Sequence, residues 1–475
     1  MAAERLVADL CVIGAGSGGL SVAAGAAQLG ASVVLVERDR MGGDCLNTGC
    51  VPSKALIAAA AAAHAHRRSA PFGTPSDAPE PDYAAAMAHV ARAIAAIAPK
   101  DSVERFEGLG VRVIRAHARF TGPAEVEAGG VRIAARRFVV ATGSTPVVPP
   151  IPGLDRVPFF TSDTIWENRE RPGRLVVIGG GPIGVELAQA HGRLGSRVEI
   201  VEMERLLPRE DPELAAVVAR ALAAEGIVVH EGAAVTEVAR GAEGIELRLA
   251  DGRGLTASHL LVATGRRPVT DGLGLDRAGV EHDGSGIRVD RCLRSVSNRR
   301  VYAVGDVAGG PQFTHVAGYH AGLVVRHALF RLPVRVRTDH IPRVTYTDPE
   351  LAQVGLAEAE ARARHGERVE VVREALARND RAVAEGRSEG MVKLVIGPRG
   401  RLLGCGIVAP HAGELVHPWA LALARGLPLR ALADYVAPYP TLGEAGQAAA
   451  RAHFAPRVFA NPWLRRLRAL LARLG

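Results

Sequence analysis

Two cysteines, Cys45 and Cys50, stand five residues apart in a glycine-rich stretch that runs from Gly42 to Lys54. An alanine-rich run follows, and it predicts a helix over 55–63. A helix N-terminus stabilises negative charge, so a thiol placed there is held as the thiolate that redox exchange requires. A reversible disulfide is therefore the favoured chemistry. A zinc half-site and two inert core thiols are the alternatives, although the sequence has no second Cys/His pair with zinc-ligand spacing.

A glycine-rich turn near the start of the chain predicts a nucleotide site. It has the form G-x-G-x-x-G, with glycines at Gly14, Gly16 and Gly19. The apolar run Leu6–Ile13 before it predicts a buried strand, and an alanine-rich helix follows. A second strand over Ser32–Val36 ends at Glu37, 23 residues after the first glycine. Glycine lets the backbone approach a pyrophosphate, and the acid accepts hydrogen bonds from a ribose.

The same unit recurs in the middle of the chain. Strands are predicted over Arg174–Ile178 and Arg197–Val201, and Glu202 again lies 23 residues after the first glycine. The glycines of this copy are Gly179, Gly181 and Gly184. Two intact units predict two bound nucleotides, and a duplication with one inactive copy is the alternative.

Each unit is trailed by a strand and a turn of similar sequence. Thr142-Gly143 closes the first turn and Gly265 lies in the second, while a further strand ends at Asp306. From about residue 341 the apolar residues alternate over Met391–Ile396 and Leu402–Val408, which predicts an antiparallel sheet.

Composition sets limits on the class of protein. The 475 residues are 48% hydrophobic and 23% charged, so we expect a globular protein of two to four domains. The net charge of +8 is scattered and aromatics make up only 4%, so we do not expect nucleic acid binding. Five cysteines, no signal peptide and no apolar run of membrane-spanning length favour the cytoplasm.

These elements, in this order, resemble the flavin-dependent pyridine nucleotide–disulfide oxidoreductases. The most specific match is G-G-x-C-x-N-x-G-C-x-P-S-K, which ends at Lys54, and Tyr346–Glu350 is similar to the start of the family's dimerisation domain. The resemblance implies an α/β fold with two Rossmann-like domains for FAD and NAD(P), an α+β C-terminal dimerisation domain, and a homodimer. The predicted parts are 1–150 (FAD, first part), 151–270 (NAD(P)), 271–340 (FAD and central region), 341–455 (dimerisation) and 456–475 (basic amphipathic tail).

The resemblance also implies roles for individual residues. FAD is expected over the first glycine turn, with Glu37 on its ribose and Asp306 on its ribityl chain, and NAD(P)H over the second turn. Lys54 and Glu186 are expected to pair beside the flavin. Cys50 is implied as the thiolate against the flavin and Cys45 as the exchanging thiol. Further backbone contacts to the cofactors are implied for Gly43, Ala118, Thr142, Gly143 and Gly265. Glu202 repels a 2′-phosphate, so NADH is expected over NADPH.

One motif departs from the family pattern. Members that act on disulfides carry H-P-x-x-x-E near the C-terminus, and here Tyr439 stands in place of the histidine while Glu444 is kept. A phenol with an unperturbed pKa of about 10 is a poor base at neutral pH. Mercuric reductases share the tyrosine but typically end in a Cys-Cys pair, whereas no cysteine follows Cys405 here.

The favoured function is that of a mercuric-reductase-like enzyme that passes electrons to a small acceptor, either a metal ion or a thiol or disulfide. The alternatives are a dihydrolipoamide-dehydrogenase-like enzyme for a specialised lipoyl protein, a diaphorase or quinone reductase with a vestigial disulfide, and a nucleotide-binding redox sensor. No resident metal is expected.

The tail carries an amphipathic pattern beginning at Trp463. One helical face holds Leu464, Leu467, Leu470, Leu471 and Leu474, and arginines lie elsewhere. Docking of this face on the body or on a partner subunit is favoured over contact with a membrane surface.

Overall fold

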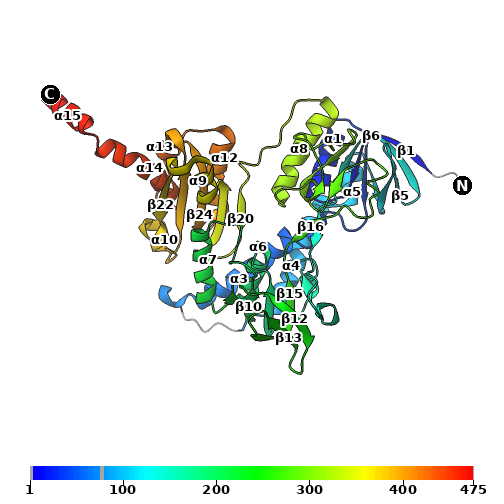
Figure 1. Cartoon of the computed structure of the whole chain (residues 1–475), viewed down its shortest axis with the longest axis horizontal. Coiled ribbons are helices and arrows are strands. Elements are labelled where there is room, and N and C mark those ends of the chain that lie inside the picture. The colour runs from blue at the N-terminus through cyan, green and yellow to red at the C-terminus, as the bar shows by residue number, and fades with distance from the viewer. Residues whose placement is uncertain (1–3, 75–79, 474–475) are drawn as a thin grey trace. The chain divides into compact units, whose positions relative to one another are not determined.

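The computed structural model describes residues 4–74 and 80–473 (Figure 1). They divide into two compact units. Unit 1 comprises Met1–Met203 and His230–Val336, and unit 2 comprises Glu204–Val229 and Arg337–Gly475. The chain therefore passes into unit 2 directly after the second nucleotide unit and then returns. This division rests on compactness alone, and the domain boundaries given above stay predictions.

The first sheet of unit 1 contains the strands around the first glycine turn. Its order is β3-β2-β1-β6-β5-β4, and β19 also pairs with β6. The bounds are β1 (Arg5–Ile13), β2 (Val33–Glu37), β3 (Val111–Arg115), β4 (Ala118–Gly122), β5 (Glu125–Ala128), β6 (Val131–Val140) and β19 (Val301–Ala303). β1 runs parallel to both β2 and β6. Apolar side chains are buried on both faces of β1, as expected for a central parallel strand.

The second sheet repeats this layout around the second glycine turn. Its order is β11-β10-β9-β15-β8. The bounds are β8 (Phe160–Thr161), β9 (Arg174–Ile178), β10 (Arg197–Val201), β11 (Val228–His230) and β15 (His259–Val262). β9 and β10 are parallel, as β1 and β2 are. The two predicted Rossmann-like units are thus confirmed, with a small antiparallel sheet beside the second one, formed by β12 (Val235–Arg240), β13 (Ile245–Leu249) and β14 (Gly254–Ala257).

Seven α-helices belong to the described part of unit 1. They are α1 (Ser17–Gln28), α2 (Gly43–Asn47), α3 (Cys50–Arg67), α4 (Tyr83–Ile97), α5 (Val103–Gly108), α6 (Pro182–Arg193) and α8 (Thr314–Phe330). The predicted helix over 55–63 is longer than expected, because α3 already begins at Cys50. Pro52 lies in its first turn, where a proline removes no intrahelical hydrogen bond, so the helix extends back to the cysteine.

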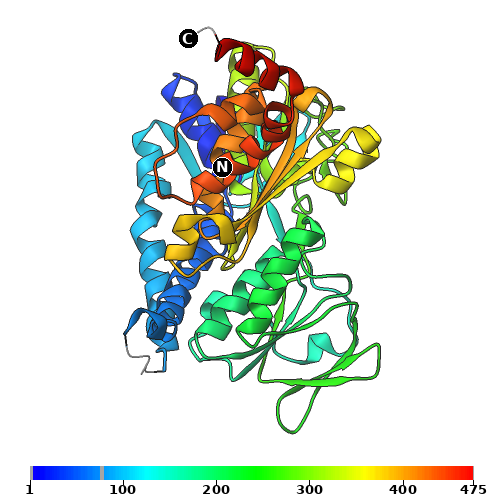
Figure 2. The same cartoon turned by 90° about the vertical axis from the view of Figure 1, so that its left-hand side faces the viewer.

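Unit 2 is built on the antiparallel sheet that the alternating pattern predicts (Figure 2). Its order is β20-β21-β24-β23-β22, with bounds β20 (Arg343–Thr345), β21 (Glu350–Gly355), β22 (Glu370–Ala375), β23 (Met391–Ile396) and β24 (Leu402–Ala409). The core on one face includes residues of α11 (Ala412–Leu415), α12 (His417–Arg425), α13 (Leu429–Asp434) and α14 (Gly443–Phe459). α10 (Asp380–Ala384) adds Ala382 to this core, and α15 (Pro462–Leu471) follows α14.

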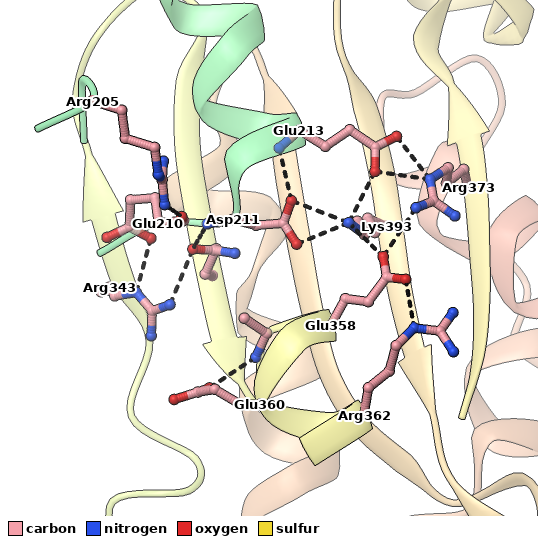
Figure 3. Close-up of polar contacts among 12 residues, drawn as sticks. Arg205, Glu210, Asp211, Glu213, Arg343, Glu358, Glu360, Arg362, Arg373 and Lys393 are labelled. Atoms are coloured by element: carbon pink, nitrogen blue, oxygen red, sulfur yellow. Dashed lines mark hydrogen bonds and ion pairs between the residues drawn. The ribbon is translucent and has the colours of Figure 1, made fainter. Parts of the chain in front are cut away.

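The other face of this sheet carries an ionic cluster that holds α7 (Pro212–Ala224) and α9 (Glu358–His365). Lys393 on β23 lies among three carboxylates (Figure 3). Its Nζ is 2.8 Å from Asp211 and 2.9 Å from both Glu213 and Glu358. Arg373 on β22 donates to Glu213 at 2.7 Å and to Glu358 at 3.0 Å. The segment that leaves unit 1 is therefore fixed in unit 2 by charge as well as by packing.

Across 4–74 and 80–473, no helix is long and apolar enough to cross a membrane.

Candidate active site

The two glycine turns have the same geometry. Gly14 and Gly179 both have a positive φ, +105° and +114°. A Cβ at either position would lie 2.4 Å from a carbonyl oxygen, that of Ala141 at the first turn and that of Ala263 at the second. Only glycine therefore fits, because both the backbone conformation and the neighbouring strand exclude a side chain.

Both acids at the strand ends hold their glycine turns. The carboxylate of Glu37 accepts from the backbone N–H of Ala15 at 2.6 Å, and that of Glu202 accepts from Gly180 at 2.6 Å. Glu37 also accepts from the N–H of Asp39 at 2.7 Å. Each acid is therefore placed at the mouth of its turn, where a nucleotide ribose would reach it.

The helices after the turns provide room for phosphate. α1 and α6 have glycine N-caps, Gly16 and Gly181, and neither cap forms a side-chain hydrogen bond. A Cβ built on Gly181 meets no atom within 4 Å, and one on Gly16 meets only the Cα of Gly43, at 3.9 Å. The first-turn N–H groups are therefore open to an anion, so both sites fit the pyrophosphate of a dinucleotide such as FAD or NAD(P).

The redox helix α2 packs directly on the first turn. Gly43 begins α2 with a φ of +56°, and a Cβ there would lie 2.7 Å from the Cα of Gly16. The N–H of Gly42 donates to the carbonyl of Ala15 at 2.9 Å. Cys45 is thus carried by a helix that is held against the nucleotide turn.

Cys45 and Cys50 are both free thiols in this structure. A hydrogen bond that Cys45 donates to Cys50 raises the pKa of Cys45, and burial adds to the rise. The same bond lowers the pKa of Cys50 to about 6 against the effect of burial, with help from the Thr314 hydroxyl and the charge of Lys54. These opposite directions favour Cys50 as the thiolate of the pair and Cys45 as the thiol.

Three features near Cys50 favour a negative charge on its sulfur, by positive electrostatic potential or by a hydrogen bond. It is the first residue of α3, so it lies at the positive end of that helix. The hydroxyl of Thr314, which begins α8, is 3.2 Å from its Sγ. Lys54 pairs with Glu186 of α6 at 2.8 Å, and the Glu186 side chain is 7% exposed. Thr314 was not predicted from the sequence, because 264 residues separate it from Cys50.

Arg266 is a further site residue that the sequence did not reveal. Its guanidinium donates to Ser144 Oγ at 2.9 Å, to Asp163 at 2.8 Å, and to Asp44, the residue before Cys45. Burial and the neighbouring carboxylate of Asp163 raise the pKa of Asp44 to about 6, although Arg266 opposes the rise. The arginine follows Gly265 directly, so it ties the loop of the second nucleotide unit to the redox helix.

The remaining residues expected at the cofactors lie at strand ends. Asp306 follows β19, accepts from Ser144 Oγ at 2.6 Å, and has its pKa raised by burial. Thr142 donates to the carbonyl of Val269 at 2.7 Å, and the carbonyl of Gly143 accepts from the Val269 N–H at 3.0 Å. Ala118 begins β4 and belongs to the same buried cluster as Val36. Their cofactor contacts stay predictions.

Tyr439 and Glu444 belong to unit 2, whereas the cysteines belong to unit 1. The Tyr439 side chain is exposed, and its hydroxyl donates to Asp380 at 3.0 Å. That acceptor raises the pKa of Tyr439. Glu444 accepts from the backbone N–H of Thr441 at 3.0 Å. The tyrosine is thus held as a protonated phenol.

Comparison with known proteins decides the family. Residues 8–321 match the pyridine nucleotide-disulphide oxidoreductases, and residues 341–450 match the dimerisation domain of the same family. The chain belongs to the pyridine nucleotide-disulphide oxidoreductase family. As an oxidoreductase of this family, it uses FAD and a pyridine nucleotide, and its dimerisation domain supports a homodimer.

Similarity to individual members of the family indicates which kinds of reaction the chain resembles. The chain is 38% identical to a mercuric reductase of Streptomyces lividans, over 93% of this chain and 95% of that protein. It is also 38% identical to a dihydrolipoyl dehydrogenase of Thermus scotoductus, over 94% and 97%. A Cu(II) complex of the flavoprotein disulfide reductase RclA from Escherichia coli superposes with a TM-score of 0.84 at 26% identity, over 94% and 99%. The chain is therefore a mercuric-reductase-like or related disulfide oxidoreductase.

Proposed function

We propose that the enzyme reduces a thiophilic metal ion, Hg(II) in the first instance, at Cys45 and Cys50 with NADH as the reductant. The reaction balances as Hg(II) plus NADH giving Hg(0), NAD⁺ and one proton. Tyr439 carries the proposal, because it stands where disulfide-reducing members have a histidine. The matches to mercuric reductases and to a copper-bound relative support a metal acceptor.

The protonation states of the site suit a metal better than a disulfide. Exchange with a disulfide substrate needs a base near neutral pH to move the proton of the attacking or leaving thiol. Tyr439 cannot serve, because its hydrogen bond to Asp380 raises its pKa further. A soft metal ion needs no such base, since coordination itself displaces the proton of a thiol.

In this proposal, Cys50 and Cys45 have different roles. FAD held over the first glycine turn would supply the hydride acceptor for the reduced nicotinamide and the two electrons that reduce the Hg(II) bound by the two thiolates. Cys50 is held as a thiolate by the start of α3, Thr314 and Lys54. Cys45 keeps its proton until the metal binds, and it releases that proton on coordination. Glu186 keeps the Lys54 ammonium in place beside them.

The preference for NADH rests on Glu202. Its carboxylate lies at the mouth of the second glycine turn and would repel a 2′-phosphate. The nearest arginine along the chain, Arg205, is engaged elsewhere, because its guanidinium donates to the carbonyls of Leu207 and Pro208 at 3.1 and 2.8 Å. We expect Glu202→Ala to reduce the NADH-over-NADPH ratio of kcat/KM by roughly tenfold, one lost charge contact being worth about 1.4 kcal/mol.

The proposed function is tested by an acceptor panel on the FAD-loaded enzyme. NADH oxidation is followed with four acceptors in turn: Hg(II), lipoamide, glutathione disulfide and a quinone. Lipoamide tests the dihydrolipoamide reaction in reverse. We expect Hg(II) to be the best acceptor, and Cys45→Ser to abolish its reduction. Cys292→Ser is the matched control, because its Sγ only donates to the carbonyl of Val334, at 3.3 Å. Hg(II) reduction that survives Cys45→Ser would contradict the proposal.

A lipoyl acceptor is the second candidate, favoured by the equal identity to a dihydrolipoyl dehydrogenase. This candidate function predicts that NADH oxidation is faster with lipoamide than with Hg(II). It also predicts that the lipoamide reaction is lost in Cys45→Ser. A quinone reductase with an idle disulfide predicts a third pattern, in which quinone turnover is unchanged in Cys45→Ser. The same panel therefore separates the three.

A further inference from the structure

The C-terminal helix α15 is a complete helix with a defined start. Pro462 is its first residue, and the side chain of Asn461 accepts from the N–H of Trp463 at 2.9 Å. Both features favour a helix that begins there. Leu474, expected on its apolar face, lies outside the described residues.

Most of the apolar face of α15 is exposed in unit 2, and only Leu467 is partly buried. None of the residues of α15 is buried, and Figure 1 shows the helix extending beyond α14, away from the sheet of unit 2. Trp463 is 65% exposed, and Leu470 and Leu471 are 57% and 55% exposed. Phe459, at the end of α14, adds a side chain that is 73% exposed. Among the described residues of unit 2, no docking of this face on its own unit is found, and docking on unit 1 or on a partner subunit stays a prediction.

The charge of the segment has one sign. No aspartate or glutamate follows Glu444 in the sequence, whereas six arginines do. They are Arg451, Arg457, Arg465, Arg466, Arg468 and Arg473. At 100° per residue, Arg466 and Arg468 lie on opposite edges of the wider apolar face formed by Trp463, Leu464, Leu467, Leu470 and Leu471. An apolar face edged by cations is the pattern of a helix that lies in the plane of an anionic membrane surface.

We propose that α15 binds the surface of an anionic lipid bilayer, with Trp463 and the leucines in the headgroup boundary and the arginines on lipid phosphates. Pairing with α15 of a second copy is disfavoured, because arginines would then face arginines and no carboxylate of the segment could neutralise them. The match to the dimerisation domain also ends at residue 450, before the helix begins. This inference is independent of the electron acceptor.

The experiment is sedimentation of the full-length, FAD-loaded enzyme with lipid vesicles. We expect binding to vesicles of phosphatidylcholine mixed with phosphatidylglycerol at about 0.15 M salt, and release at about 1 M salt, where charges are screened beyond about 3 Å. Arg466→Gln combined with Arg468→Gln should weaken binding roughly 30-fold, from the usual contribution of a basic residue near such a surface. Trp463→Glu should weaken it at least as much, since it places a charge in the apolar face.

Phe72→Glu is the matched control, because Phe72 is another exposed aromatic, at 66%, outside this helix. It should bind vesicles as the unmodified enzyme does, and all variants should keep NADH oxidation without lipid. Equal binding to pure phosphatidylcholine, or none to anionic vesicles, would overturn the proposal. So would a change of oligomeric state in Trp463→Glu, measured by light scattering, because the helix would then be a subunit contact.

Discussion

Replacing Lys393 by methionine tests how far buried charge fixes α7 in unit 2. The side chains of Lys393 and Asp211 are only 5% and 3% exposed (Figure 3). Without the lysine, Glu213 and Glu358 keep Arg373, but Asp211 loses the only cation that contacts it among the described residues. A buried carboxylate left without its partner costs about 3–5 kcal/mol.

The measurement is a urea titration combined with hydrogen exchange of α7. With a urea dependence of about 2 kcal/mol per molar, the unfolding midpoint of unit 2 should fall by roughly 1.5–2.5 M. Exchange should increase first over Pro212–Ala224, because Asp211 is the N-cap of this helix. Arg430→Met is the matched control, since it removes a pair of similar length, 2.7 Å, whose side chains are 64% and 58% exposed. Its expected cost is below about 0.5 kcal/mol.

A double variant separates two effects of Lys393→Met: the loss of the attraction to Lys393, and the cost of a buried Asp211 carboxylate left without a cation. Asp211→Asn keeps an oxygen to accept from the N–H of Glu213, as the aspartate does at 3.0 Å, but carries no charge. Combined with Lys393→Met, it should recover most of the lost stability. If Lys393→Met shifts the midpoint no more than Arg430→Met, the cluster does not hold α7, and the reasoning from burial fails.

Three further predictions concern the site. In the two-electron-reduced holoenzyme, we expect a long-wavelength charge-transfer absorbance from the proposed Cys50 thiolate to the flavin, and it should fade as pH falls through about 6. Lys54→Met should move that midpoint to higher pH by removing a stabilising charge, and an unmoved midpoint would contradict the assignment. Arg266→Gln should lower the free energy of unfolding by about 2–3 kcal/mol in a urea titration, because Asp44 and Asp163 lose their shared cation, and Asp44→Asn should recover part of it. Tyr439→His should raise dihydrolipoamide turnover by on the order of tenfold or more, and unchanged turnover would mean that the missing base is not what limits disulfide chemistry.

The acid pH dependence of unit 2 follows from the same cluster. Burial would raise the pKa of Glu358, but the hydrogen bonds from Lys393 and Arg362 outweigh it and lower the value to about 2. A carboxylate whose pKa is lowered by folding stabilises the protein above its unfolded value of about 4.5, and that stability is lost as pH falls from there towards 2. Unit 2 should therefore weaken in this window, and Lys393→Met should flatten the dependence.

The features that were predicted from sequence are those encoded locally. Each glycine turn, its two strands and its acid lie within about 30 residues, so the spacing of Gly14 and Glu37 carries the whole geometry. The antiparallel sheet of unit 2 was likewise visible in the alternation along β23 and β24. The start of α3 at Cys50 could also have been inferred, because Pro52 is compatible with a first helical turn but not with a helix interior.

The features that were missed depend on contacts between distant residues. Asp44 and Arg266 are 222 residues apart, and Lys393 and Asp211 are 182 apart. Each looks like an ordinary surface charge in the sequence, since burial and partner are set only by the tertiary fold. The aspartate before Cys45 was the one available signal, because an acid beside an exchanging thiol disfavours its thiolate unless a cation is near.

The asymmetry between the two thiols follows from where α3 begins. Cys50 lies at the positive end of α3, and the charge of Lys54 helps to lower its pKa. Cys45 sits within the short helix α2, beside Asp44, and its thiol donates a hydrogen bond to the Cys50 thiolate, which raises the pKa of Cys45. The pair therefore holds one negative charge rather than two at neutral pH. In the proposed reaction, a divalent soft cation would draw the second proton from Cys45 and find two thiolates. We therefore expect a soft metal ion to be a better acceptor than a disulfide, which the acceptor panel tests directly.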